Sequence, residues 1–180
     1  MSLSRIDLFA LIVFLSVAFF MTAGAQDANL EMGILDPGFA EQGSPAPDFR
    51  LKDLDMNLVQ LSQYRGTPVI LNFFASWCGP CIIEMPYIQA AHEQATDNGY
   101  VVLGVAVEDS RGAIEDMMAS ENFTYLVVID GDSSVKLTYQ VVGPPYTFFI
   151  DRTGTIQTVV SGPLEQEELD LQLAQLLDTE

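Results

Sequence analysis

This sequence has few positively charged residues. Its 180 residues include 7 Lys and Arg against 25 Asp and Glu, which gives a formal net charge of −18 at pH 7. A surface of this sign repels the phosphates of nucleic acids and of anionic lipids, so neither is expected as a partner. Because 49% of the residues are apolar, the chain can still build one domain with a hydrophobic core. The composition therefore predicts a single acidic domain and leaves its chemistry open.

Cysteine and histidine are also scarce. The chain has two cysteines, Cys78 and Cys81, and one histidine, His92. A structural zinc site needs four ligands, so this set is too small and no metal is expected. A purely structural disulfide is a second interpretation, but a bridge across so short a loop constrains the unfolded chain little. The pair is therefore better explained by a chemical role.

The first 25 residues differ from the rest of the chain. Arg5 precedes an apolar run from Leu8 to Met21, and Ala23-Gly24-Ala25 supplies the small residues after which a signal peptidase cleaves. The run is shorter than the roughly 20 apolar residues of a membrane span, although the stretch up to Ala25 nearly reaches that length. We expect residues 1–25 to be a signal peptide, or alternatively a signal anchor, and the domain to be periplasmic or otherwise extracytoplasmic.

Residues 26–44 are rich in Gly and Pro, which indicates a linker or N-terminal extension. We expect one domain at residues 45–180. Short apolar runs alternate with helical patterns, which predicts an α/β fold with a mixed β-sheet flanked by helices. The expected elements are a hairpin (49–54 and 58–61), strands (69–74, 101–107 and 125–129), helices (81–97, kinked at Pro86, and 111–120), a second hairpin (147–150 and 156–160) and a C-terminal helix with Glu165, Glu167 and Glu168 in its first turn.

The segment Trp77-Cys78-Gly79-Pro80-Cys81 lies where a buried strand ends and a helix begins. Unpaired N–H groups and the positive end of the helix dipole stabilise a thiolate at such a place, which lowers the pKa of the cysteine. An exposed Cys78 would then be a nucleophile, and Cys81, one helical turn later, could attack the mixed disulfide that it forms. We therefore predict redox chemistry for the pair.

The sequence at this point resembles a known family. Residues 72–81 (Asn-Phe-Phe-Ala-Ser-Trp-Cys-Gly-Pro-Cys), followed by Glu84-Met85-Pro86, are similar to thioredoxin-like thiol-disulfide oxidoreductases of the TlpA/ResA/CcmG (AhpC/TSA-redoxin-like) type. The segments 46–49 and 61–66 match as well, so the resemblance covers about three quarters of the chain. It implies a thioredoxin-like fold with an N-terminal hairpin and an inserted helix-strand unit between Arg111 and Ile129.

The resemblance also implies roles for individual residues. The family has a cis-proline opposite the cysteine pair, and Gly143-Pro144-Pro145-Tyr146-Thr147-Phe148 matches that loop, with Pro145 as the cis residue. Two departures concern client specificity: Pro144 has no side chain that can donate a hydrogen bond, and Tyr146 replaces a more usual Thr. The residues expected to bind the client are Trp77, Gly79, Pro80, Pro144, Pro145 and Tyr146.

Glu84 lies three residues after Cys81, on the same face of the expected helix. In the resembled proteins a glutamate here handles the proton of the second cysteine. The alternative is a solvated glutamate in the first turn of a helix. Asn72 occupies the place of a buried aspartate in cytoplasmic thioredoxin, so another carboxylate is needed for proton transfer. Cys78, Cys81 and Glu84 are therefore the expected catalytic residues.

The expected activity is reduction of disulfides in client proteins by the Cys78/Cys81 dithiol, with no cofactor besides this redox-active disulfide. A membrane electron-donor thiol-disulfide protein would regenerate a monomeric enzyme, and cytochrome c maturation is the role that the resemblance favours. Two alternatives stay open. The segment Ala46-Pro47-Asp48-Phe49 also opens peroxiredoxin-like thiol peroxidases. A non-catalytic metal-delivery module could use the two thiols as ligands.

Overall fold

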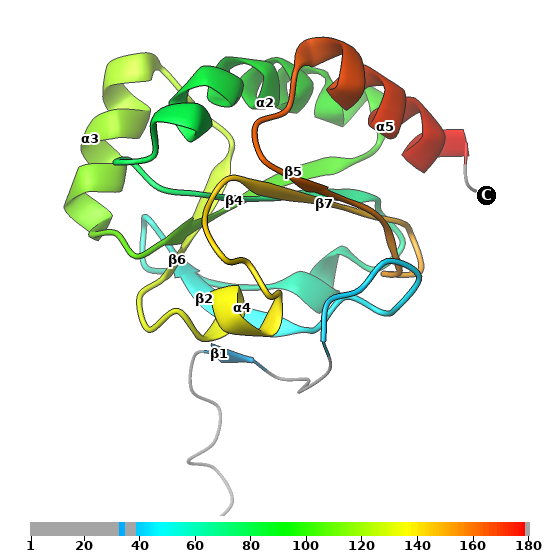
Figure 1. Ribbon diagram of the computed structural model, residues 1–180, viewed down its shortest axis with the longest axis horizontal. Helices are drawn as coiled ribbons and strands as arrows, with labels where there is room; N and C mark the ends of the chain where they lie inside the picture. Colours follow the sequence, from blue (N-terminus) through cyan, green and yellow to red (C-terminus); the bar gives the residue numbers. More distant parts are fainter. Residues whose placement is uncertain (1–32, 35–38, 179–180) are drawn as a thin grey trace, which may run out of the picture. The chain divides into compact units, whose positions relative to one another are not determined.

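The computed structural model describes residues 33–34 and 39–178. The predicted signal peptide or anchor at residues 1–25 lies outside them. The described strands are β1 (Gly33–Ile34), β2 (Phe49–Asp53), β3 (Leu58–Gln60), β4 (Val69–Phe74), β5 (Val101–Val107), β6 (Leu126–Asp130), β7 (Tyr146–Ile150) and β8 (Ile156–Ser161). They form one sheet in the order β1-β2-β6-β5-β4-β7-β8, with β3 paired to β2 (Figure 1). Strands β4, β5 and β6 are parallel and the other pairings are antiparallel, so the sheet is mixed.

Strand β4 lies between β5 and β7, and all of its residues are buried. Because alternate side chains of a strand point to opposite faces, Ile70 and Phe74 join the core on one face and Leu71 and Phe73 the core on the other. Burial on both faces is the reason that this stretch reads as a nearly continuous apolar run. Asn72 interrupts the run, and by the same alternation it shares the face of Ile70 and Phe74.

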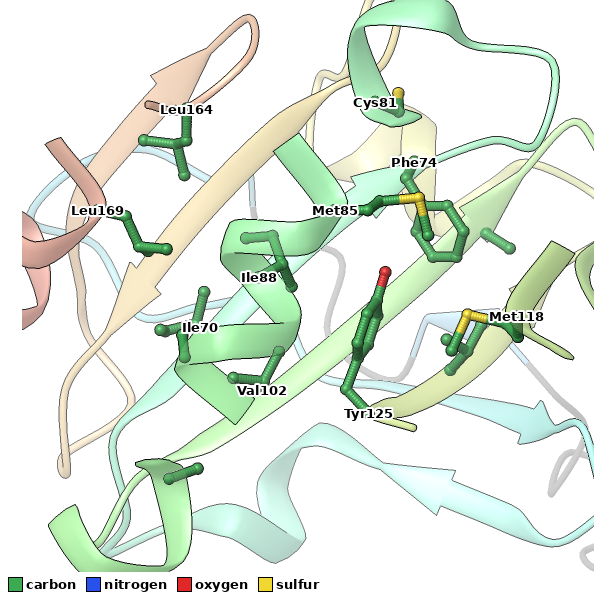
Figure 2. Close-up of a cluster of buried hydrophobic side chains, with 14 of the residues drawn as sticks. Ile70, Phe74, Cys81, Met85, Ile88, Val102, Met118, Tyr125, Leu164 and Leu169 are labelled. Atoms are coloured by element: carbon green, nitrogen blue, oxygen red, sulfur yellow. The ribbon is translucent and has the colours of Figure 1, made fainter. Parts of the chain in front are cut away.

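Helices cover both faces of the sheet. The described ones are α2 (Gly79–Asn98), α3 (Arg111–Glu121), α4 (Ser134–Thr138), α5 (Gln166–Asp178) and the 3-10 helix η1 (Leu61–Tyr64). Helices α2, α3 and α5 lie on one face and α4 on the other (Figure 1). Figure 2 shows the core under α2, where Met85 and Ile88 pack with Ile70 and Val102 of the sheet. None of the described helices is long and apolar enough to cross a membrane.

The mixed sheet flanked by helices is confirmed. The N-terminal hairpin consists of β2 and β3, and the inserted helix-strand unit consists of α3 and β6. Strand β6 pairs parallel with β5 and antiparallel with β2. The insertion therefore widens the sheet and joins its parallel centre to the N-terminal hairpin.

Several element bounds differ from the prediction. Helix α2 begins at Gly79 rather than Cys81 and continues through Pro86 to Asn98. Strand β6 begins at Leu126, because its pairing with β5 starts there rather than at Tyr125. Helix α5 begins at Gln166, so Glu165 precedes it and accepts a backbone hydrogen bond from Leu169. The short elements α4 and η1 were not predicted, since neither is long enough to show a helical period.

The described part of the segment before residue 45 is hydrogen-bonded to the domain. Strand β1 pairs antiparallel with β2. The N–H of Ala40 donates to the carbonyl of Thr138, and the N–H of Gly43 donates to the carbonyl of Ile156. This segment therefore contacts α4 and the beginning of β8.

Candidate active site

The two cysteines form a disulfide at the N-terminus of α2. The S–S distance is 2.05 Å and the two Cα atoms are 5.3 Å apart. Cys78 is the N-cap residue, and the N–H of Cys81 donates to its Sγ at 3.2 Å. Pro80 fits the first turn because the N–H that it lacks would have no partner there. The sequence thus places one sulfur in front of the free N–H groups of the helix, where a thiolate is stabilised.

The two sulfur atoms differ in access. Cys78 is 4% exposed and Cys81 is 0% exposed, so Cys78 is the sulfur that another molecule can reach. This exposure is much smaller than the sequence suggested, because neighbouring segments cover most of the residue. Trp77, which precedes Cys78 in the chain, adds exposed apolar surface and is 58% exposed. Gly79 and Pro80 are exposed as well.

The proline loop lies beside Cys78. The carbonyl oxygen of Pro144 is 3.5 Å from Cys78 Sγ. In the disulfide this is a polar contact, since the sulfur carries no proton, whereas a reduced thiol could donate along the same line. The peptide bond between Pro144 and Pro145 is cis, Pro145 is buried, and Tyr146 begins β7 half-buried. The structure therefore brings the expected client-binding residues Trp77, Pro144, Pro145 and Tyr146 to the surroundings of one sulfur.

Glu84 lies one helical turn after Cys81 and is completely buried. Its two carboxylate oxygens accept hydrogen bonds from Asn72 Nδ2 at 2.8 Å and from the backbone N–H of Leu164 at 2.7 Å. Burial raises the pKa of Glu84 from 4.5 to about 7, although the two hydrogen bonds oppose this shift. The carboxyl group can therefore gain or lose a proton near neutral pH, as a general acid or base requires. The alternative of a solvated glutamate is wrong for this residue.

Two further residues surround Glu84, and sequence reasoning missed one of them. Asn72 Nδ2 also contacts Thr147 Oγ1 at 3.0 Å, while Asn72 Oδ1 has no hydrogen-bond partner. Tyr125 is 2% exposed, and its hydroxyl also lacks a partner. Burial raises the pKa of Tyr125, and the charge of Glu84 raises it further. Figure 2 shows the Tyr125 hydroxyl directed toward Phe74 and Met85, on the side of the cluster where Cys81 lies. The sequence pattern marked Tyr125 as the first residue of an expected apolar strand and carried no signal of a role in the site.

The loop between β4 and α2 is held by residues that follow β5. The backbone N–H of Ser76 donates to the Asp109 carboxylate at 2.7 Å, and Trp77 Nε1 donates to the carbonyl of Glu108 at 3.1 Å. The Glu108 carboxylate in turn pairs with Lys136 of α4. These two acidic residues directly follow the buried strand β5, which pairs with β4, the strand that precedes the cysteines. That position was the one signal by which they could have been found. Within the described part of the chain, no three His, Cys, Asp or Glu side chains are grouped so as to hold a metal ion.

A disulfide at the N-terminus of the helix that follows a central parallel strand, with a proline loop beside it, is the arrangement of a thioredoxin-like thiol-disulfide oxidoreductase. Known proteins support this class. The chain is 36% identical over 131 residues to the thiol-disulfide oxidoreductase ResA of Geobacillus kaustophilus. This alignment covers 73% of this chain and 75% of that protein. The model of the AhpC/TSA family matches residues 42–159, and the chain belongs to this family.

Solved structures agree with the fold. The crystal structure of a putative thiol:disulfide interchange protein DsbE from Chlorobium tepidum has a TM-score of 0.71 at 29% identity and covers 77% of this chain and 99% of that chain. The pneumococcal exposed lipoprotein thioredoxin Etrx1 from Streptococcus pneumoniae has a TM-score of 0.64 at 30% identity, with 72% and 99% covered. This chain is therefore a thiol-disulfide oxidoreductase with a thioredoxin-like fold.

Proposed function

We propose that this protein reduces disulfides in client proteins outside the cytoplasm, with Cys78 as the attacking sulfur, Cys81 as the resolving sulfur and Glu84 as the proton acceptor for Cys81. The observation that carries the proposal is the burial of Glu84 one turn behind the disulfide, with a pKa of about 7. An accessible sulfur in front and a titratable carboxyl group behind supply the two properties that the exchange needs.

The reaction takes place in two exchanges. The Cys78 thiolate attacks one sulfur of the client disulfide, so a mixed disulfide forms and the first client sulfur leaves as a thiolate that takes up a proton. Cys81 then gives its proton to Glu84, and its thiolate attacks Cys78 Sγ. The second client sulfur leaves and is protonated, and the Cys78–Cys81 disulfide is restored. The client gains two electrons and two protons, which the enzyme dithiol has lost.

Replacement of the resolving sulfur tests the assignment of roles. In the Cys81→Ala variant the first exchange can occur but the second cannot, so clients should stay covalently attached to Cys78. The Cys78→Ala variant is the matched control and should retain none, because Cys81 is completely buried. Equal trapping by both variants would show that the order of the two sulfurs is wrong.

Glu84→Gln tests the proton acceptor. Loss of a general base slows a step by on the order of 10²-fold or more, so the mixed disulfide should accumulate during a single turnover and decay slowly. The rate of the first exchange should change much less, since Cys78 loses no proton to Glu84. Equal slowing of both exchanges would contradict this role.

The direction of the reaction rests on the Gly-Pro pair between the cysteines, which resembles the reducing members of the superfamily. A measured reduction potential near that of a strong oxidant such as DsbA, about −120 mV, would overturn it. An extracytoplasmic reductase needs a supply of electrons, so a membrane thiol-disulfide protein is part of the proposal. The name of the Etrx1 relative, an exposed lipoprotein, supports the location. Apocytochrome among the clients trapped by Cys81→Ala would support a role in cytochrome c maturation, whereas a broad mixture would indicate a general reductase.

A further inference from the structure

Two segments flank Cys78, and each is held by a different part of the fold. The first carries Trp77, whose Nε1–H donates to the carbonyl of Glu108 at 3.1 Å. Glu108 has a φ of 52°, in the left-handed region that side-chain-bearing residues rarely adopt. Trp77 is 58% exposed and its indole has one polar group, so the hydrogen bond to the Glu108 carbonyl helps to hold the orientation of the ring.

The second segment runs from the end of α4, at Tyr139, into the proline loop that contains Pro144 and Pro145. The N–H of Val141 donates to the carbonyl of Lys136 at 3.0 Å. The N–H of Lys136 donates in turn to the buried carboxylate of Asp130 at 2.7 Å. The carbonyl oxygen of Pro144, at the far end of the loop, lies 3.5 Å from Cys78 Sγ. The position of this loop is therefore coupled to the position of Lys136.

One ion pair joins the two segments. Lys136 Nζ is 2.6 Å from Glu108 Oε1, and the lysine side chain is 11% exposed while the glutamate side chain is 46% exposed. Lysine is seldom buried without a partner, and its ammonium group here faces the residue that orients Trp77. The pair Arg111–Glu115 has the same separation of 2.6 Å, but both of its side chains are more than 40% exposed and both belong to α3. That pair joins no separate elements.

We propose that the Lys136–Glu108 ion pair is a positioning device for client polypeptides: it ties Trp77 to the proline loop and so sets the space through which a client reaches Cys78. The inference rests on the proposed reduction of protein disulfides, because a small disulfide needs no alignment between the two segments. It assigns no chemical step to either residue. The loss of the pair should therefore weaken reduction of a polypeptide while it spares exchange with a small disulfide.

The experiment compares two substrates for reduced enzyme: insulin, as a polypeptide disulfide, and 5,5′-dithiobis(2-nitrobenzoate), as a small one. Lys136→Met and Glu108→Gln should each lower kcat/KM for insulin by about fivefold or more, mainly through KM, and change the rate with the small disulfide by less than about twofold. The conservative Lys136→Arg should retain most of the insulin activity. The matched control Arg111→Met/Glu115→Gln should behave as wild type with both substrates.

Trp77 supplies an independent measurement, because it is the only tryptophan of the chain. Its fluorescence anisotropy in the reduced protein should fall in Lys136→Met and Glu108→Gln, as the indole gains freedom, but not in the α3 control. Equal losses with both substrates, or unchanged insulin kinetics and anisotropy in Glu108→Gln, would overturn the positioning role. Failure of the wild type to reduce insulin while it exchanges with the small disulfide would instead overturn the proposed reduction of proteins, and this inference with it.

Discussion

The burial of Glu84 should make the stability of the oxidised protein depend on pH, and Glu84→Gln isolates this effect. Both carboxylate oxygens accept hydrogen bonds, from the Leu164 N–H and from Asn72 Nδ2. A glutamine can keep the first bond through its carbonyl group. Its amide N–H would face Asn72, whose Oδ1 has no partner and can turn to accept. The variant is therefore expected to fold with the site nearly unchanged.

The magnitude follows from the shift in pKa. Burial raises the pKa of Glu84 from 4.5 to about 7, a difference of about 2.5 units. Each unit corresponds to 1.36 kcal/mol, so the free energy of unfolding should change by about 3 kcal/mol. Between pH 4.5 and 7 the native protein holds a proton that the unfolded chain has released. The free energy of unfolding therefore falls as pH rises through this window, and it is level on either side. The uncharged side chain of the Glu84→Gln variant has no such dependence.

Urea denaturation of the disulfide-bonded proteins at several pH values between 4 and 8.5 measures this difference. Relative to Glu84→Gln, the wild type should lose about 3 kcal/mol across the window, whereas its other carboxylates contribute equally to both proteins. Glu93→Gln removes an exposed carboxylate from the same helix and is the matched control. A wild-type-to-variant difference that is the same at pH 5 and pH 8 would refute the claim that burial sets the proton affinity of Glu84.

Three more substitutions test the surroundings of the site. Asn72→Asp places a second carboxylate beside Glu84, and because two neighbouring buried carboxylates resist ionising together, the pH profile of single-turnover resolution should move to higher pH. Gly104→Ala puts a Cβ 2.9 Å from Phe74 Cε1, so overpacking should cost about 1–3 kcal/mol in urea denaturation. Leu169→Ala removes a completely buried side chain of α5 and should cost about 2–5 kcal/mol by the same measurement, and a cost below about 1 kcal/mol would contradict its place in the core.

The sequence was informative about the fold where burial and period are both strong. The apolar run of β4 predicted its bounds because burial on both faces leaves no polar positions except Asn72. The five residues of α4 show no period, and the start of the helix is held by the buried carboxylate of Asp130, which accepts from the N–H groups of Val135 and Lys136 five and six positions later in the chain. A single aspartate at the end of an apolar strand does not by itself indicate that a helix follows.

Some residues of the site could be predicted from the sequence and others could not. Cys78, Cys81 and Glu84 could be found because they lie within seven consecutive residues and the helical period relates them. Leu164 could not, since its contribution is a backbone N–H eighty positions away, which any residue type other than proline could supply. Tyr125 could not either, because an aromatic residue in an apolar strand is ordinarily explained by packing alone.

Burial makes Glu84 a better acceptor for the proposed proton transfer from Cys81. A thiol of ordinary pKa near 8.5 gives its proton to a solvated carboxylate of pKa 4.5 at a cost of about 5 kcal/mol, because the two differ by about 4 units. With the pKa of Glu84 raised to about 7, the same transfer costs about 2 kcal/mol. The completely buried Cys81 has no bulk water beside it to accept the proton instead. The packing that buries Cys81 therefore also raises the pKa of the group proposed to deprotonate it, and the difference in depth between the two sulfurs supports the different roles proposed for them.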